Sequence, residues 1–269
     1  MEISLKNIGI NKGHHIILHA SYRAIQNAFP GIDAGKFLSS IQNIISPEGS
    51  LILPTFTYCF KRRKEVYEIF NHKKSPSKVG YLSEYFRNMP DVVRTSSPTH
   101  SFAMWGEISK YLSSDNSPES PLGRESIFDW LSERDNSYIL LFGCDFTSMS
   151  FIHYLEIIYD VPWKDFFPWN YMKVIPVGES TDGEHNLKEV PGCSKAFVSF
   201  EKYLHEKKLI YKQEVNGTLY YYLSIEKLLN DAGYFFSNNY LELLCSKGSC
   251  PACDSRREFY FSSIKGSGT

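Results

Sequence analysis

His153 and Glu156 form the pair of side chains in this sequence that is best suited to acid–base chemistry. They stand three positions apart in a stretch with helical apolar spacing, so they project from one helix face about one turn apart. In general base catalysis an imidazole commonly accepts the proton while a neighbouring carboxylate orients the imidazole. Taken alone, the pair could also be half of a metal site or a surface ion pair. The surrounding elements must distinguish these possibilities from a catalytic pair.

The order of elements around the pair favours a catalytic position. An apolar run from Tyr138 to Phe142 ends at Gly143, and a polar loop follows before the helical pattern begins. This order of strand, loop and helix places the pair near the carboxyl end of a sheet, where open α/β folds bind their ligands. We therefore predict that residues 138–163 carry the chemistry.

The first two thirds of the chain alternate between strand and helix patterns. Strand patterns occupy residues 14–21, 51–56 and 101–105, and helical patterns occupy 34–45, 79–89 and 125–135. This alternation is typical of an α/β fold with a largely parallel core. We predict a mixed central β-sheet flanked by helices, in three αβα layers.

The pattern changes from Lys173 onward. The segments on both sides of Asn216-Gly217 predict an antiparallel hairpin, because this dipeptide is a strong hairpin signal. A helix is expected over 195–209, and two more helices broken near Gly233. Because the sequence holds no long Pro/Gly/Ser linker and no internal repeat, we expect one domain spanning residues 1–269.

Short polar residues follow the predicted strands and are expected to gather at one sheet edge. Each has a structural alternative, since Ser and Thr after a strand often cap the next helix. Their coincidence at four strand ends favours a binding site. The candidates for binding a cofactor are His19, Ser21, Thr55, Thr57, Arg94 and Ser101, and the candidates for binding a substrate are Ser97, His100 and Thr147.

The composition of the chain excludes several classes of protein. Apolar residues make up 42% and charged residues 22% of the 269 residues, as in ordinary globular proteins. The net charge is −1 without a basic stripe, so no nucleic-acid partner is expected. No apolar run approaches the ~18 residues of a membrane span, and the first residues lack a secretory pattern. We therefore expect a cytoplasmic protein without a membrane partner.

Cysteines near the end of the chain raise the question of a metal site. Cys245, Cys250 and Cys253 form C-x4-C-x2-C, with Cys193 and His205 as conceivable fourth ligands. Structural zinc sites usually show two ligand pairs, and only one C-x-x-C is present. The sequence therefore favours free thiols, with no metal required.

Several blocks of the chain resemble the aminoglycoside N3-acetyltransferase-like family, also called the antibiotic N-acetyltransferase family. The blocks are ILHASYRAIQ, LILPTFTY, VGYLSEYFRNMPDVVRTSSPTHSFAMWG, SPLGRESIFDWL and ILLFGCDFTSMSFIHYLEIIYDVPW, and with weaker agreement further on they cover most of the chain. The resemblance implies a mixed sheet flanked by helices and acyl transfer from acyl-CoA to the amine of an amino sugar. Its catalytic histidine and glutamate correspond to His153 and Glu156.

Two departures from the family pattern concern the acceptor. Ser97-Pro98 stands where the family often has His-Pro, and Glu125-Ser126-Ile127 stands in place of Gly-Ser-Pro. Aminoglycosides are polycations, which a nearly neutral chain is not expected to attract strongly. The aromatic content of 15% also suits stacking on a nucleobase. We therefore predict a nucleotide-linked (dTDP or UDP type) amino sugar for surface polysaccharide as acceptor, with an aminoglycoside as the alternative.

The predicted chemistry is direct attack of a neutral amine on a thioester, without an acyl-enzyme. His153 would take the proton of the amine while Glu156 orients the imidazole. Donors near Thr55 and Thr57 would stabilise the oxyanion, and Arg94 would pair with a phosphate. A non-catalytic sugar-binding or zinc-stabilised module is the alternative from another class. The sequence leaves open the acyl chain and whether the protein is a homo-oligomer.

Overall fold

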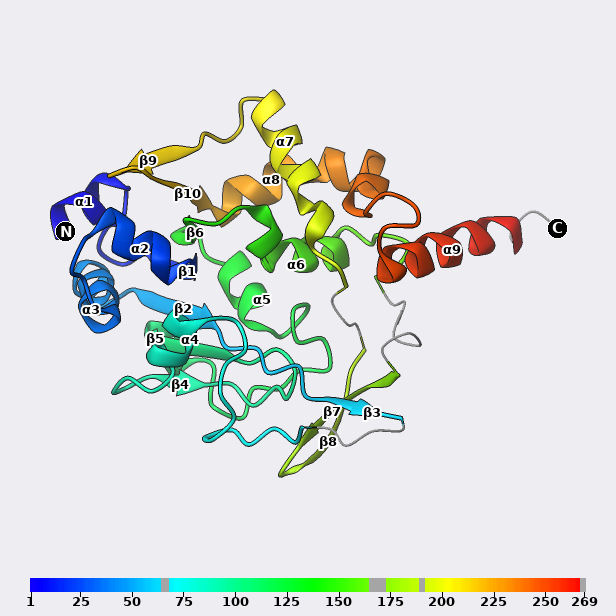
Figure 1. The fold of residues 1–269 in the computed structure, drawn as a ribbon, viewed down its shortest axis with the longest axis horizontal. Helices are drawn as coiled ribbons and strands as arrows, with labels where there is room; N and C mark the ends of the chain where they lie inside the picture. The colour runs from blue at the N-terminus through cyan, green and yellow to red at the C-terminus, as the bar shows by residue number, and fades with distance from the viewer. Residues whose placement is uncertain (64–67, 165–172, 189–191, 267–269) are drawn as a thin grey trace.

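A seven-stranded sheet organises the chain, as the computed structural model shows (Figure 1). The structure describes residues 1–63, 68–164, 173–188 and 192–266. Strands β1, β2 and β6 run parallel at its centre, and the other strands are antiparallel to their neighbours. Along the sheet the order is β4 (Val93–Arg94), β5 (Phe102–Gly106), β2 (Ser50–Pro54), β1 (His15–Ala20), β6 (Ser137–Phe142), β10 (Thr218–Ser224) and β9 (Gln213–Val215). The predicted mixed sheet is confirmed.

Helices cover both faces of this sheet, which confirms the three layers. Along β6, Ile139 and Leu141 belong to one apolar core, whereas Leu140 and Phe142 belong to the other. One face is covered by α1 (Glu2–Asn7), α2 (Tyr22–Ala28), α3 (Ala34–Ile45) and α4 (Tyr81–Phe86). The other is covered by α5 (Ile127–Ser132), α6 (Phe151–Ile158), α7 (Val198–Glu206) and α8 (Ile225–Asn238). Burial on both faces explains why the central strands are continuous apolar runs.

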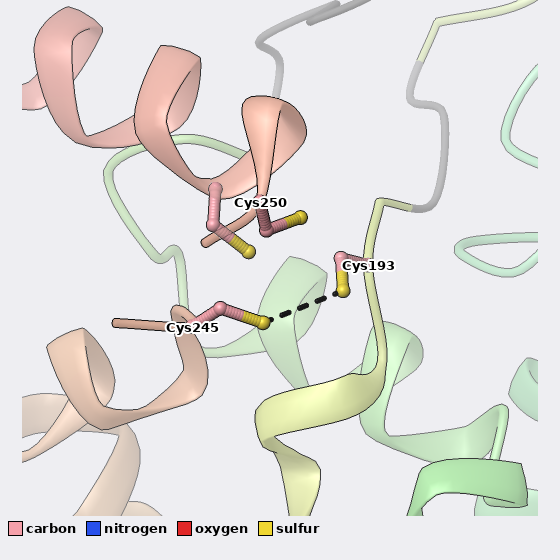
Figure 2. A group of neighbouring side chains, drawn as sticks. Cys193, Cys245 and Cys250 are labelled. Atoms are coloured by element: carbon pink, nitrogen blue, oxygen red, sulfur yellow. Dashed lines mark hydrogen bonds between the residues drawn. The ribbon is translucent and has the colours of Figure 1, made fainter. Parts of the chain in front are cut away.

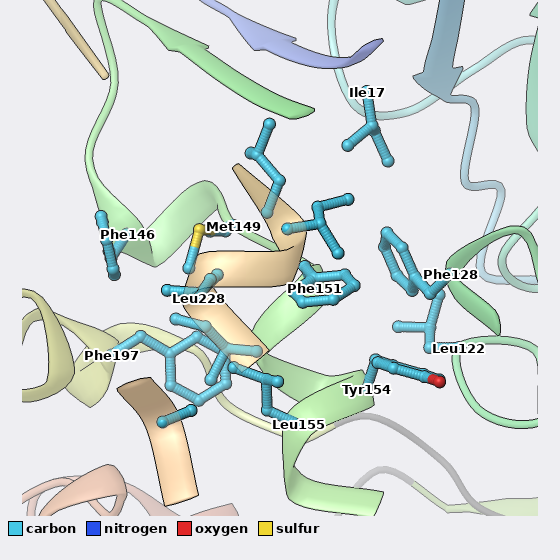
Figure 3. Packing of buried hydrophobic residues seen from close by; sticks show 14 of the residues in the cluster. Ile17, Leu122, Phe128, Phe146, Met149, Phe151, Tyr154, Leu155, Phe197 and Leu228 are labelled. Carbon is cyan, nitrogen blue, oxygen red and sulfur yellow. The ribbon is translucent and has the colours of Figure 1, made fainter. Parts of the chain in front are cut away.

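The core on the α6 side fixes the helix that carries His153 and Glu156. Figure 3 shows Phe151 and Phe197 near Leu155, with Phe128 beside Phe151. All four side chains are fully buried. Because truncating a buried aromatic side chain typically costs about 3–5 kcal/mol, this packing holds α6 firmly in place.

Local signals set where the predicted helices begin. The Asp33 carboxylate accepts a hydrogen bond from the Lys36 amide at 2.7 Å and caps α3. Ser21 and Ser126 cap α2 and α5 in the same way. Such caps satisfy amides that a helix leaves unpaired in its first turn. The helix predicted over 34–45 matches α3, while those over 79–89 and 125–135 are longer than α4 and α5.

A smaller sheet and the predicted hairpin lie outside the central strands. The smaller sheet joins β3 (Phe60–Arg62), β7 (Val174–Ser180) and β8 (Gly183–Asn186), all antiparallel. Asn216 and Gly217 both have positive φ, 47° and 78°, as a two-residue hairpin turn between β9 and β10 requires. The hairpin prediction is confirmed.

The predicted helix break near Gly233 is wrong. Helix α8 runs unbroken from Ile225 to Asn238, because Ala232, Phe235 and Phe236 pack into the core and outweigh the low helix propensity of glycine.

The remaining helices are α9 (Pro251–Gly266) and the short η1 (Glu107–Lys110), η2 (Phe146–Ser148), η3 (Lys195–Phe197) and η4 (Tyr240–Leu243). None of the helices in the described ranges is both long and apolar enough to cross a membrane.

Candidate active site

A cavity of about 730 Å³ opens where β1, β2 and β6 end, at the edge where parallel strands of open sheets bind ligands. Its volume lies in the range of small-molecule sites. Five of the predicted site residues line it: His19, Ser21, His100, Thr147 and His153. Four of these, all but His153 on α6, are polar residues that follow or flank strands, so these four gather at one edge as predicted.

His153 and Glu156 meet through a hydrogen bond on α6. His153 Nδ1 lies 2.7 Å from Glu156 Oε2, and because the carboxylate can only accept, Nδ1 carries the proton. The other ring nitrogen, Nε2, is then unprotonated in the neutral ring and can accept a proton. The ring packs edge-on against Phe197 at 4.8 Å between centroids, so its orientation is fixed from two sides.

Glu156 is held as a carboxylate by three groups. The side chain is only 3% exposed; its Oε1 accepts a hydrogen bond from Trp163 Nε1 at 3.0 Å and lies 3.5 Å from Arg256 Nη1. Burial alone would raise the pKa of Glu156, but the Arg256 guanidinium and the His153 hydrogen bond lower it below its usual range. The negative charge that orients His153 is therefore preserved.

Arg256 is a residue of the site that sequence reasoning missed. It comes from α9, more than ninety positions after Glu156, and is itself 3% exposed. Gly192 lies against it, since a Cβ built on that glycine would stand 2.3 Å from Arg256 Cζ. Nothing in the local sequence separates Arg256 from the neighbouring Arg257, because only the tertiary fold reveals which arginine points inward.

Two further histidines of the cavity are held neutral. Burial lowers the pKa of His19 to about 4, and burial together with nearby His153 lowers that of His100 to about 3. His100 Nδ1 lies 2.9 Å from Thr99 Oγ1. Within the described part of the chain, His19 Nε2 has no hydrogen-bond partner although it is buried. His19 can therefore donate to or accept from a bound molecule without carrying a charge.

Arg94, predicted to contact a cofactor phosphate, makes internal hydrogen bonds in this structure. Its Nε donates to Ser101 Oγ at 3.1 Å, Nη1 to the Ser75 carbonyl at 2.6 Å and Nη2 to the Thr55 carbonyl at 2.9 Å. The guanidinium also stacks on Phe70, with 5.0 Å between Cζ and the ring centroid. Each of its three nitrogens thus has an internal partner, and it does not line the cavity.

The same internal network occupies Thr55, Thr57 and Ser101. The amides of Thr55 and Thr57 donate to the carbonyls of Ser101 and Thr99, and their hydroxyls to those of Ser101 and Pro98. Ser101 Oγ donates to the Thr55 carbonyl. These predicted oxyanion donors are therefore already engaged.

Two predicted acceptor-binding residues lie in different surroundings. Ser97 is also turned inward, because its hydroxyl accepts the His100 amide at 3.1 Å. Thr147 lines the cavity, and both its amide and its hydroxyl donate to Asp145. Of this pair only Thr147 is placed to touch a bound molecule.

The charge of the described cavity wall is slightly positive. Lys195 is present and no carboxylate lines the wall among the residues that the structure describes. Its aromatic side chains are Phe56, Tyr58 and Phe60, whereas most other aromatic residues pack in the two cores. The aromatic content of the chain is therefore explained largely by core packing.

Comparison with known proteins identifies the family of this site. A family profile described as aminoglycoside 3-N-acetyltransferase matches residues 17–236, which is most of the chain. The chain belongs to this family. It is an acyl-CoA-dependent N-acetyltransferase by that membership, as the resemblance in the sequence predicted.

Individual relatives agree with this assignment. An SPbeta prophage-derived aminoglycoside N(3')-acetyltransferase-like protein, YokD of Bacillus subtilis, is 25% identical over 222 residues, which cover 68% of this chain and 80% of that protein. The apoenzyme of aminoglycoside acetyltransferase AAC(3)-IVa has the same fold, with a TM-score of 0.79 at 21% identity over 96% of this chain and 95% of that one. A complex of AAC-IIIb with CoASH gives 0.71 at 14% identity over 88% and 95%.

Proposed function

We propose that this acetyltransferase moves the acetyl group of acetyl-CoA to a primary amine of an aminoglycoside-type amino sugar, with His153 as the general base. The observation that carries the proposal is the His153–Glu156 hydrogen bond of 2.7 Å on a helix that borders the cavity. A base must stand within hydrogen-bond reach of its substrate, and a cavity residue with a free ring nitrogen meets that condition. Family membership supplies the reaction class.

The reaction would proceed by direct attack. The amine nitrogen forms a bond to the thioester carbon, its proton passes to His153 Nε2, and the C–S bond then breaks. The proton can return to the departing CoA thiolate, so the histidine is regenerated without a covalent intermediate. Glu156 stabilises the imidazolium that forms in between, and general base assistance of this kind is typically worth ~10² to 10⁴ in rate.

His19 is the donor that we assign to the thioester oxygen. Its buried Nε2 lacks a partner among the described residues. The lowered pKa keeps the ring neutral, and the tautomer with the proton on Nε2 can donate to the thioester oxygen. It lies at the end of β1, on the cavity wall. Donors aimed at developing charge in a site with little water commonly contribute about 3–4 kcal/mol of transition-state stabilisation.

We base the proposed acceptor on the names of the relatives and give less weight to the nearly neutral charge of the chain. YokD, AAC(3)-IVa and AAC-IIIb carry aminoglycoside acetyltransferase or closely related names, which favours an aminoglycoside-type acceptor over the predicted nucleotide-linked amino sugar. The latter stays a second candidate for one reason. The described cavity wall offers Lys195 and no carboxylate, which suits a diphosphate better than a polycation.

One assay separates these acceptors. Release of CoA thiol from acetyl-CoA is followed with an aminoglycoside panel and with UDP- and dTDP-linked amino sugars, using wild type and Lys195→Gln. We expect turnover with aminoglycosides and little change on loss of Lys195. Turnover only with the nucleotide-linked sugars, weakened in the variant, would replace our acceptor by the second candidate. Sugar binding without thiol release in either series would indicate a non-catalytic module.

We also propose that residues 1–269 act as one catalytic unit. In support, both apolar cores lie on the two faces of a single sheet. The catalytic pair on α6 is held by Arg256 from α9, near the end of the chain. A single cooperative unfolding transition, lost together with activity, is the expected result in thermal unfolding followed by two probes.

A further inference from the structure

Four cysteines that lie far apart in the sequence meet at one point of the fold. The sulfur atoms of Cys193, Cys245, Cys250 and Cys253 all lie within 4.8 Å of one another, and those of Cys193 and Cys245 are 3.6 Å apart. Figure 2 shows Cys193 on the segment before α7, Cys245 after η4 and Cys250 at the start of α9. None of them is joined in a disulfide.

The arrangement has the donor set and the size of a structural zinc site. A tetrahedral Zn²⁺ with Zn–S bonds of about 2.3 Å spaces its sulfurs about 3.8 Å apart, close to the separation of Cys193 and Cys245. Soft thiolates in a set of four select zinc or iron over hard cations. We propose that these four cysteines bind one structural Zn²⁺.

The first turn of α9 supports the proposal independently. Pro251 is the first residue of that helix, which leaves Cys250 just before it. The Lys195 amide donates a hydrogen bond to the Cys193 sulfur at 3.4 Å. Amide donors around the ligands, and a helix N-terminus beside them, stabilise the negative charge of zinc-bound thiolates.

The position of the cluster explains what a bound ion would hold together. Helix α9 extends away from the body of the protein toward the C-terminus (Figure 1). Cys253 and Arg256 stand three positions apart near its start, and both are buried. A zinc ion would fasten this turn to the segments that carry Cys193 and Cys245. Because Arg256 pairs with Glu156, the ion would also fix the arginine that supports the catalytic pair.

The sequence gives a reason why this site is easily missed. Cys250 and Cys253 form the one C-x-x-C pair, and Cys193 is 52 positions before Cys245. His205, the other conceivable ligand, donates or accepts at Tyr221 Oη instead, 2.8 Å away. Three of the four cysteines also lie beyond residues 17–236, the part matched by the family profile. The sequence alone left Cys193 and His205 open as fourth ligands, and the fold brings Cys193 to the other three cysteines.

Metal analysis of the full-length protein tests the proposal. Protein purified without a polyhistidine tag and without added metal is analysed for zinc and iron by mass spectrometry. We expect one zinc per chain, kept in Cys59→Ser and lost in Cys193→Ser and Cys245→Ser. Cys59 is a matched control, because it is a buried thiol outside the cluster. Iron in place of zinc, or less than a tenth of an equivalent of metal, would overturn the assignment.

A second measurement uses the wild type alone, so that misfolded variants cannot obscure the answer. A thiol-modifying mercurial is titrated into the protein while released zinc is followed with a chromophoric chelator. Release of one zinc as four thiols react is expected, and removal should lower the melting temperature by about 5 °C or more. Thiols that react without zinc release, or a Cys193–Cys245 disulfide found by peptide mapping, would contradict the proposal.

Discussion

Replacing Arg256 with methionine tests how the fold supports the catalytic pair. The substitution keeps much of the buried aliphatic volume but removes the cation 3.5 Å from Glu156 Oε1. Truncating one partner of a buried ion pair typically costs about 3–5 kcal/mol, because a charge is left buried without compensation. Here Trp163 and His153 still donate to the carboxylate, so we expect the low end, about 3 kcal/mol.

That loss can be measured as stability and as a pH shift. About 3 kcal/mol corresponds to a fall in melting temperature of roughly 6–12 °C for a chain of this size. The pKa of Glu156 lies below its usual range in the folded protein, so the charged carboxylate stabilises the fold above its unfolded pKa and loses this effect as the pH falls through its folded pKa. Without Arg256 the folded pKa rises, and the loss begins at a higher pH.

Denaturant unfolding and CoA release at a series of pH values provide the assay. Arg124→Met is the control, because Arg124 pairs with Asp129 at 3.1 Å on the surface, where such pairs are worth about 0–1 kcal/mol. We expect Arg256→Met to lose stability and to move the acidic limb of activity upward, with Arg124→Met near wild type. Equal stability and an unmoved acidic limb in Arg256→Met would refute the assigned role.

We expect the network around Arg94 to be structural. Arg94→Met should destabilise the protein by about 2–4 kcal/mol but change the KM for acetyl-CoA by no more than about twofold. A tenfold rise in KM with unchanged stability would instead support a role in cofactor binding. Burial lowers the pKa of His15 and His19 to about 4 and that of His100 to about 3. The unfolded chain therefore binds protons that the folded one does not, so the free energy of unfolding should decrease as the pH falls from about 6.5 to about 4; a flat profile over this range would contradict it. Gly143→Ala should destabilise the protein by more than about 2 kcal/mol, because φ is +67° and the new Cβ would stand 2.1 Å from Ala24 Cβ. Gly183 also has a positive φ but faces open space, so Gly183→Ala should lower the free energy of unfolding by less in the same assay.

Much of the fold could be predicted because its signals are local. The apolar run at 138–142, the cap at Asp33 and the turn at Asn216-Gly217 each specify their own element, and the structure has all three. Gly233 shows the limit of local reasoning. Its low helix propensity is worth about 1 kcal/mol, which the packing of Phe235 and Phe236 readily outweighs.

The candidate site could be predicted only where a residue acts from its own element. His153 and Glu156 are one turn apart on α6, so their spacing in the sequence was enough to pair them. Arg94 and Thr57 have the same residue types as binding groups, and their internal hydrogen bonds become visible only in the fold. Arg256 comes to Glu156 from more than ninety positions further along the chain, and no periodicity in the sequence predicts such a long-range contact.

The most direct test of the central claim is the turnover of His153→Ala with acetyl-CoA and an aminoglycoside, measured as CoA thiol release beside His72→Ala. His72 is a suitable control, because it lies outside the cavity and binds the Arg94 carbonyl. Loss of the general base should lower kcat by ~10² to 10⁴, while the Kd for acetyl-CoA stays near wild type. A kcat for His153→Ala within about threefold of wild type would contradict the account.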